Sequence, residues 1–131
     1  MRILERHEQI RHMLSCLGIS FARHGHSCLL IAIEKVCNGA VPGRVLYEEI
    51  AEMKKSTHSR VRANIRYVIP LAQKRGIPLY TAITGRNSTD ALPSPGEFIK
   101  ACAAWVLNNN AVLEYDSRLN KTVVVWKPIA P

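Results

Sequence analysis

A basic segment with helical periodicity constrains the fold of this chain more than any other feature. Residues 53–75 include seven Lys or Arg side chains and no acidic one. Within this segment Val61, Ile65, Val68 and Ala72 recur at the spacing of one helix face. A helix with a single apolar stripe has to bury that stripe against other elements of a domain. The sequence therefore predicts a helix that packs on a core and exposes its cations.

The predicted helix begins near Thr57 and follows a second amphipathic segment. Residues 45–55 have apolar side chains at helical spacing, and the polar stretch 56–59 is rich in residues that cap helices. Two helices joined by three or four polar residues are typical of a helix-turn-helix. Pro70 lacks an amide hydrogen, so we expect a kink beyond the first half of the second helix. Residues 45–75 are therefore predicted to form a helix-turn-helix.

The remaining periodicity predicts a mainly α fold of about six helices with a C-terminal β-hairpin. A capping box at Ser94 and Glu97, with Pro95 between them, marks one helix start. β-branched and aromatic residues near the end of the chain are typical of a hairpin. Further helices are expected at 3–17, 27–37 and 95–107, one helical turn near 79–83 within a loop at 77–93, and strands at 112–116 and 122–126. We expect a helical domain over 1–110 and a hairpin extension with its tail over 111–131.

The face opposite the apolar stripe combines small, aromatic and cationic side chains, with arginines on both flanks. Its members are Ser59, Arg60, Arg62, Ala63, Arg66 and Tyr67. Arginine donates two hydrogen bonds to guanine, and a small side chain such as Ala63 allows close approach to the bases. Four further residues, at the helix start and before it, are candidates for phosphate contacts or capping: Lys54, Lys55, Thr57 and His58. We therefore predict that this helix reads the major groove of double-stranded DNA.

Composition and motif content disfavour most other functional classes. The net charge of +8 suits a polyanionic partner. No carboxylate pair, nucleophile–base set or phosphate loop stands out, so we expect no enzyme and no cofactor. The segment His24-Gly-His26-Ser-Cys28 matches no zinc spacing, and no metal site is expected. The apolar runs are far shorter than the roughly 20 residues that span a bilayer, and the charged N-terminus lacks a signal sequence, so we expect a cytoplasmic, nucleoid-associated protein without membrane contacts.

Several short blocks, in one order between about Glu8 and Leu107, carry a family resemblance. They are Leu17-Gly-Ile, Gly25, Ala32-Ile33, Leu46-Tyr47, Ile50-Ala51, Ser59-Arg60-Val61, Ile65-Arg66, Arg75-Gly76 and Glu97-Phe98-Ile99. In this order the chain resembles the C-terminal DNA-binding domain of the stage 0 sporulation protein A family of response regulators. The resemblance implies an all-helical domain of about six helices. It also implies that the second helix of the helix-turn-helix reads the major groove, and that protomers often bind in tandem on repeated sites.

The resemblance is uneven on the face that would read DNA. The positions that match the family type are Ser59, Arg60 and Arg66. In contrast, Arg62, Ala63 and Tyr67 stand where the family has an acid, an arginine and a histidine. The fold of the family is therefore expected here, but its DNA site is not.

The resemblance also bears on regulation and partners. The family has an N-terminal receiver domain, whereas here the helix-turn-helix domain takes up nearly the whole chain, so we expect no receiver and no phosphorylation control. The partner candidates besides DNA are a second copy, as a homodimer or tandem protomer, RNA polymerase and a full-length regulator. An alternative function is a receiver-less interaction protein that pairs with a full-length regulator through the hairpin edge.

The hairpin lies outside the resemblance and has its own alternatives. Arg118 and Lys121, near its tip, are candidates for a wing that contacts phosphate or the minor groove. The simpler interpretation is that the strands cover the core or form a dimer edge.

Overall fold

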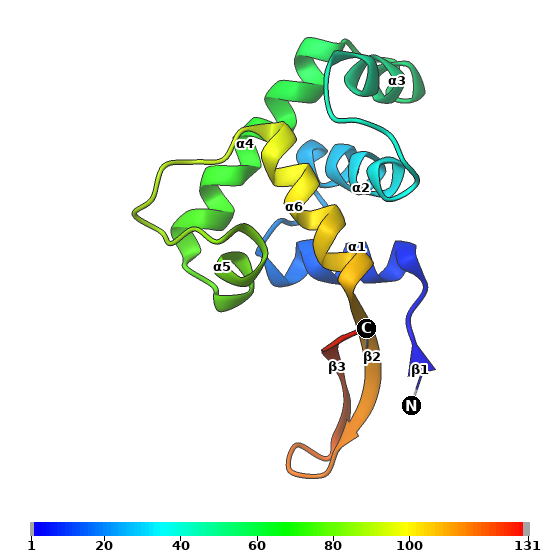
Figure 1. Ribbon diagram of the computed structural model, residues 1–131, viewed down its shortest axis with the longest axis vertical. Helices are drawn as coiled ribbons and strands as arrows, with labels where there is room; N and C mark the ends of the chain where they lie inside the picture. Colours follow the sequence, from blue (N-terminus) through cyan, green and yellow to red (C-terminus); the bar gives the residue numbers. More distant parts are fainter. Residues whose placement is uncertain (1, 130–131) are drawn as a thin grey trace.

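Residues 2–129, which a computed structural model describes, form six helices and a small antiparallel sheet that projects from one end of the helical part (Figure 1). The elements in chain order are β1 (Arg2–Ile3), α1 (Arg6–Cys16), α2 (His24–Cys37), α3 (Arg44–Lys54), α4 (His58–Arg75), α5 (Pro78–Thr84), α6 (Pro95–Asn108), β2 (Asn109–Asp116) and β3 (Lys121–Pro128). The mainly α architecture with a C-terminal hairpin confirms the fold class predicted from the sequence. The turn of helix expected near 79–83 is α5.

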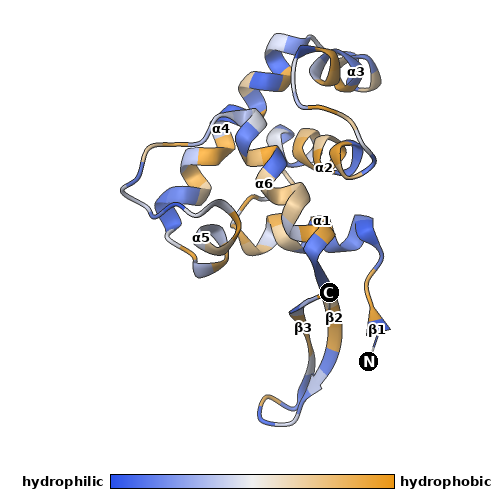
Figure 2. Ribbon diagram, in the orientation of Figure 1, coloured by the Kyte–Doolittle hydropathy of each residue, from blue (hydrophilic) through white to orange (hydrophobic). Residues whose placement is uncertain are grey.

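The predicted basic helix is α4, and its apolar stripe lies in the core. Val61, Ile65 and Val68 are at most 1% exposed, and α4 packs against α2, α3 and α6. Hydrophilic residues alternate with this stripe along the first turns of α4, whereas α2 is largely hydrophobic (Figure 2). The helix continues through Pro70, so the proline does not end it.

The first turn of α2 lies against α4 at close range. A Cβ on Gly25 would meet the backbone oxygen of Asn64 at 2.5 Å and Cγ1 of Val68 at 2.7 Å. Only glycine permits this approach of the two backbones. The helix begins at His24, before the start at residue 27 expected from the sequence, and no side chain caps it because its N-cap residue is Arg23. The true start therefore carries no capping signal in the sequence.

The start of the chain joins the sheet. The sequence analysis assigns Ile3 to the first helix, and this is wrong, because Arg2 and Ile3 pair antiparallel with Leu113 and Val112 of β2. β1 is too short to show a period of two in the sequence. β2 also begins earlier than predicted, at Asn109, directly after α6. The result is a three-stranded sheet in the order β1-β2-β3.

The base of the hairpin rests on the helices. The ring of Trp126 in β3 lies 6.1 Å from the ring of Trp105 in α6 and 6.2 Å from that of His12 in α1, measured between centroids. Trp126 packs against the hydrophobic core. This contact agrees with the interpretation that the strands cover part of the core.

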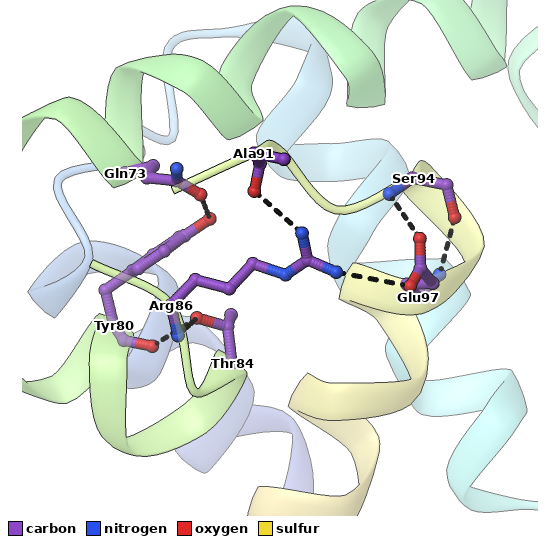
Figure 3. Close-up of polar contacts among 7 residues, drawn as sticks. All are labelled: Gln73, Tyr80, Thr84, Arg86, Ala91, Ser94 and Glu97. Atoms are coloured by element: carbon purple, nitrogen blue, oxygen red, sulfur yellow. Dashed lines mark hydrogen bonds and ion pairs between the residues drawn. The ribbon is translucent and has the colours of Figure 1, made fainter. Parts of the chain in front are cut away.

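A buried glutamine ties α4 to the loop before α6 and to α5, the second of these contacts being drawn in Figure 3. Gln73 is 2% exposed. Its Nε2 donates to the carbonyl of Asp90 at 2.6 Å, and its Oε1 accepts from the hydroxyl of Tyr80 at 2.7 Å. Because both ends of the amide are bonded, the buried polar group is satisfied. The C-terminal half of α4 is thereby held in place relative to the loop.

The predicted capping box starts α6, and Arg86 binds to it (Figure 3). The Ser94 hydroxyl accepts from the amide of Glu97 at 3.1 Å, and the Glu97 carboxylate accepts from the amide of Ser94 at 2.9 Å. Arg86 donates to the same carboxylate at 3.3 Å and to the carbonyl of Ala91 at 2.7 Å. The Ser94 amide, followed by the Ser94 hydroxyl and Arg86, holds the pKa of Glu97 below its ordinary value. This network fixes the start of α6 beside α4.

A buried histidine makes the stability of the fold depend on pH. His26 in α2 is 4% exposed, and burial, with a further effect of Arg11, lowers its pKa from the ordinary 6.5. Below pH 6.5 the unfolded chain binds a proton that the folded one does not, so the free energy of unfolding falls as the pH is lowered from 7 toward 5. We expect His26→Gln to flatten this slope in urea denaturation, and the exposed His24→Gln to retain it. The same slope in both variants would remove His26 from this account.

Candidate nucleic-acid interface

The turn between α3 and α4 consists of three residues with defined roles. Lys55 ends α3 in the left-handed conformation, with φ 53°. Thr57 precedes α4, and its Oγ1 accepts from the amide of Arg60 at 3.2 Å. The residues predicted for a helix-turn-helix thus form two helices joined by a short, capped turn.

The left-handed conformation of Lys55 is expected to lower the stability of the fold. A lysine in this conformation is disfavoured by about 1 kcal/mol relative to glycine. Lys55→Gly is therefore expected to raise the free energy of unfolding by about 1 kcal/mol, and Lys55→Ala is not. Both variants lose the same charge, so the difference in stability between them reports the backbone conformation at this position. Equal stability of the two variants in urea denaturation would contradict the strain assigned to Lys55.

The site residues predicted on the face of α4 opposite its apolar stripe are exposed. We call this face the α4 surface, and it consists of Ser59, Arg60, Arg62, Ala63, Arg66 and Tyr67, all of them exposed. None of the three arginines forms an ion pair with an acidic side chain of residues 2–129. The acids that do form pairs lie on other elements. The structure therefore brings together the six predicted residues as an unneutralised cationic face.

Arg23 extends this face, and the sequence analysis missed it. Its guanidinium carbon lies 5.5 Å from the centroid of the Tyr67 ring, which is the distance of a cation–π contact. Tyr67 is 60% exposed, so the stacked pair remains open to solvent. Arg23 is the N-cap residue of α2 and is far from Tyr67 in the sequence. No local pattern indicates this contact, because it depends on how α2 packs against α4.

A basic groove runs along one flank of α4, between the start of α2 and the α3–α4 turn. Its volume is about 660 Å³, and no acidic side chain lines it. The polar residues that line it are His24, Lys54, Lys55, Ser56, Arg60 and Asn64. The two lysines predicted to contact phosphate thus lie beside Arg60 in one concave surface. His24 and Asn64 are additions that the sequence did not indicate.

The opposite flank of α4 has two concave sites, a hollow lined by side chains of both charges and a pocket near the start of α4. The hollow, of about 310 Å³, contains Arg62 and Arg66 but also the carboxylate residue Glu97. His58, the first residue of α4, is partly buried and lines the pocket with Arg62. Every predicted residue from the turn and from α4 therefore lies on or beside the α4 surface.

The two predicted wing residues lie elsewhere. The hairpin points away from α3 and the start of α4, toward the opposite end of the molecule (Figure 1). Arg118 forms an exposed ion pair with Asp116 at 3.6 Å, and Lys121 is exposed at the start of β3. The structure does not bring Arg118 and Lys121 to the α4 surface, because the strands continue from the far end of α6.

The structure also bears on metal ligands and on membrane spans. No three His, Cys, Asp or Glu side chains of residues 2–129 are grouped to hold a metal ion. His26 and Cys28 are buried in α2, whereas His24 is exposed. No helix within these residues has both the length and the apolar character needed to cross a membrane.

Comparison with known proteins adds no assignment. No protein-family model matches the chain, and no curated protein matches it. The resemblance to the sporulation regulator family therefore rests on the residue blocks given above and stays a prediction. The geometry and charge of the α4 surface are the observations that bear on function.

Proposed function

We propose that this protein binds double-stranded DNA as a sequence-specific transcription regulator, with α4 in the major groove. The observation that carries the proposal is the α4 surface, an exposed helix face whose three arginines have no acidic partner among residues 2–129. Exposed helix faces usually mix both signs of charge. A purely cationic face on the second helix of a helix-turn-helix is complementary to the negative charge of DNA, and the helix fits the major groove.

The residues of the α4 surface divide by the contacts that they would make. Arg66 would donate to O6 and N7 of a guanine, and Ala63 would allow the helix to come close to the bases. Arg60 and the lysines of the basic groove would neutralise phosphates on one side. Phosphate contacts fix register and affinity, and base contacts provide specificity. The base contacts alone would therefore determine which DNA sequence the protein prefers.

A random library of duplexes tests this proposal. We expect the full chain to enrich a sequence that contains guanine, at the low salt at which phosphate contacts are strong. The spacing of repeated half-sites in the enriched duplexes also reports whether a dimer or tandem protomers bind. Retention of no duplex at low salt would overturn the proposal.

Salt dependence gives a quantitative prediction. If Lys54, Lys55, Arg60 and Arg62 each neutralise one phosphate, the logarithm of affinity falls against the logarithm of salt with a slope of about −3.6. Between 50 and 200 mM salt the affinity then falls about 150-fold. The measurement is fluorescence anisotropy with a duplex of arbitrary sequence, and Arg118→Gln is the control, expected to keep the slope. A slope near zero would mean that these cations do not contact phosphate.

One observation favours the alternative of an interaction protein. β3 is the outer strand of the sheet, eight residues long, and its free edge can pair with a strand of another chain. A full-length response regulator or a second copy would be the partner. Co-purification of a regulator, together with absence of duplex binding at low salt, would favour this function over DNA binding.

A further inference from the structure

A second concave site lies where three helices begin. Its volume is about 390 Å³, and its lining includes the first residues of three helices, namely Arg44 of α3, His58 of α4 and the turn from Ser94 to Gly96 of α6. We call it the three-helix pocket. Each of these helices has at least 11 residues. The start of a helix carries a partial positive charge and unpaired amide groups, so three starts in one place favour an anion.

The side chains of the three-helix pocket have the same sign. Arg44, His58 and Arg62 line it, and no acidic side chain does. Arg44 is paired with Glu48 at 2.7 Å, whereas Arg62 forms no ion pair within residues 2–129. Among the described residues that line the pocket, Arg62 is therefore the arginine without an acidic partner.

A buried tyrosine provides an independent indication of a ligand. Tyr47 is 6% exposed and lines the pocket. Its hydroxyl forms none of the hydrogen bonds within residues 2–129, although the other buried tyrosine, Tyr80, donates to Gln73. Burial raises the pKa of Tyr47 and Arg62 opposes the change, so the hydroxyl is protonated at neutral pH and lies near this arginine. The ring of Tyr47 is buried, and its hydroxyl, which keeps its proton and has no protein partner, is open to the pocket, where it is a donor available to an anion.

We propose that the three-helix pocket binds a single phosphate group, with Tyr47 as the neutral donor and Arg62 as the cation. Arg62 also belongs to the α4 surface, so the assignment of this phosphate to a DNA strand beside α4 rests on the proposed function. The same chemistry would hold the phosphate of a small ligand. Glu97 makes the neighbouring hollow less favourable, which leaves the three-helix pocket as the phosphate site on this flank.

The first experiment titrates inorganic phosphate into the full chain and follows the amide resonances of Arg44 and Gly96. We expect both to shift with phosphate and not with sodium chloride at the same ionic strength. The shifts should be much smaller in Tyr47→Phe, which removes one oxygen and leaves the buried ring. Because that hydroxyl has no protein partner to lose, the thermal midpoint of the variant should equal that of the wild type.

The second experiment measures binding to a 20-base-pair duplex of arbitrary sequence. Tyr47→Phe should weaken it roughly 10- to 150-fold, as expected for a hydrogen bond to a charged group, without changing the salt slope. Arg62→Gln should lower the magnitude of the slope by about one. Tyr115→Phe, on the hairpin, is the matched control and should bind as the wild type does.

The outcomes separate this inference from the proposed function. Phosphate shifts together with weaker duplex binding by Tyr47→Phe support a DNA phosphate. Phosphate shifts with unchanged duplex binding support a small phosphorylated ligand. If neither effect occurs while the wild type binds duplex, the pocket inference is overturned and DNA binding by α4 stands. If the wild type binds no duplex, the proposed function fails, and the phosphate shifts alone decide for or against the pocket.

Discussion

Arg66→Ala is expected to lose about 1–3 kcal/mol of discrimination between the selected duplex and one in which the contacted guanine is replaced. This corresponds to a ratio of affinities that falls by roughly five- to 150-fold. The reason is geometric, because Arg66 is exposed on the α4 surface and forms no ion pair with an acidic side chain among the described residues. Competition titrations with the two duplexes measure the ratio directly.

Two arginine variants serve as controls for Arg66. Arg62→Ala, at the flank, should weaken both duplexes by the same factor, since a phosphate contact is independent of sequence. Arg118→Ala, whose side chain is 90% exposed on the hairpin, should change neither affinity. Unchanged discrimination by Arg66→Ala would remove Arg66 as the residue that reads the base.

Gly25→Ala is expected to destabilise the fold by about 1–3 kcal/mol, as insertion of a methyl group into a packed contact does. The new Cβ would lie 2.5 Å from the backbone oxygen of Asn64, and a backbone atom cannot turn aside as a side-chain end can. The helices α2 and α4 have to separate. Arg23, two residues earlier, would move from Tyr67, so weaker duplex binding should accompany the loss. Urea denaturation with an unchanged m value measures the effect.

Gly96→Ala provides the matched control, since both glycines lie in the first turn of a helix. A Cβ at Gly96 would meet Pro42 Cβ at 3.6 Å, an ordinary van der Waals contact. Alanine is the better helix former, so this variant should keep the stability or gain up to about 1 kcal/mol. If Gly25→Ala proved as stable as Gly96→Ala, the close packing of α2 on α4 would be contradicted.

The sequence predicts what depends on local pattern. The apolar stripe of α4 follows from a period of 3.6, because only one face of a helix can enter the core. The capping box at Ser94 and Glu97 is predicted from spacing, because its two hydrogen bonds join residues three positions apart. The six residues of the α4 surface follow from the same wheel once the buried stripe is known. These features are all confirmed as structure, and their role in DNA binding stays a prediction.

Features that depend on tertiary packing could not be predicted from the sequence. β1 pairs with a strand more than 100 residues away and is only two residues long, so its partner determines its conformation. Arg23 meets Tyr67 only because Gly25 lets α2 approach α4. The three-helix pocket likewise needs the starts of α3, α4 and α6 in one place. The direction of the hairpin, which separates Arg118 from the α4 surface, has no signal in the turn sequence.

The most direct test of the central claim is an amide chemical-shift map of the full chain with the selected duplex. We expect the largest changes in the α3–α4 turn and the first three turns of α4, with smaller ones at the start of α2. We also expect that these changes disappear with rising salt, while those of β2 and β3 stay small throughout. Changes confined to the hairpin, or absent at low salt with the duplex in excess, would contradict DNA recognition by α4.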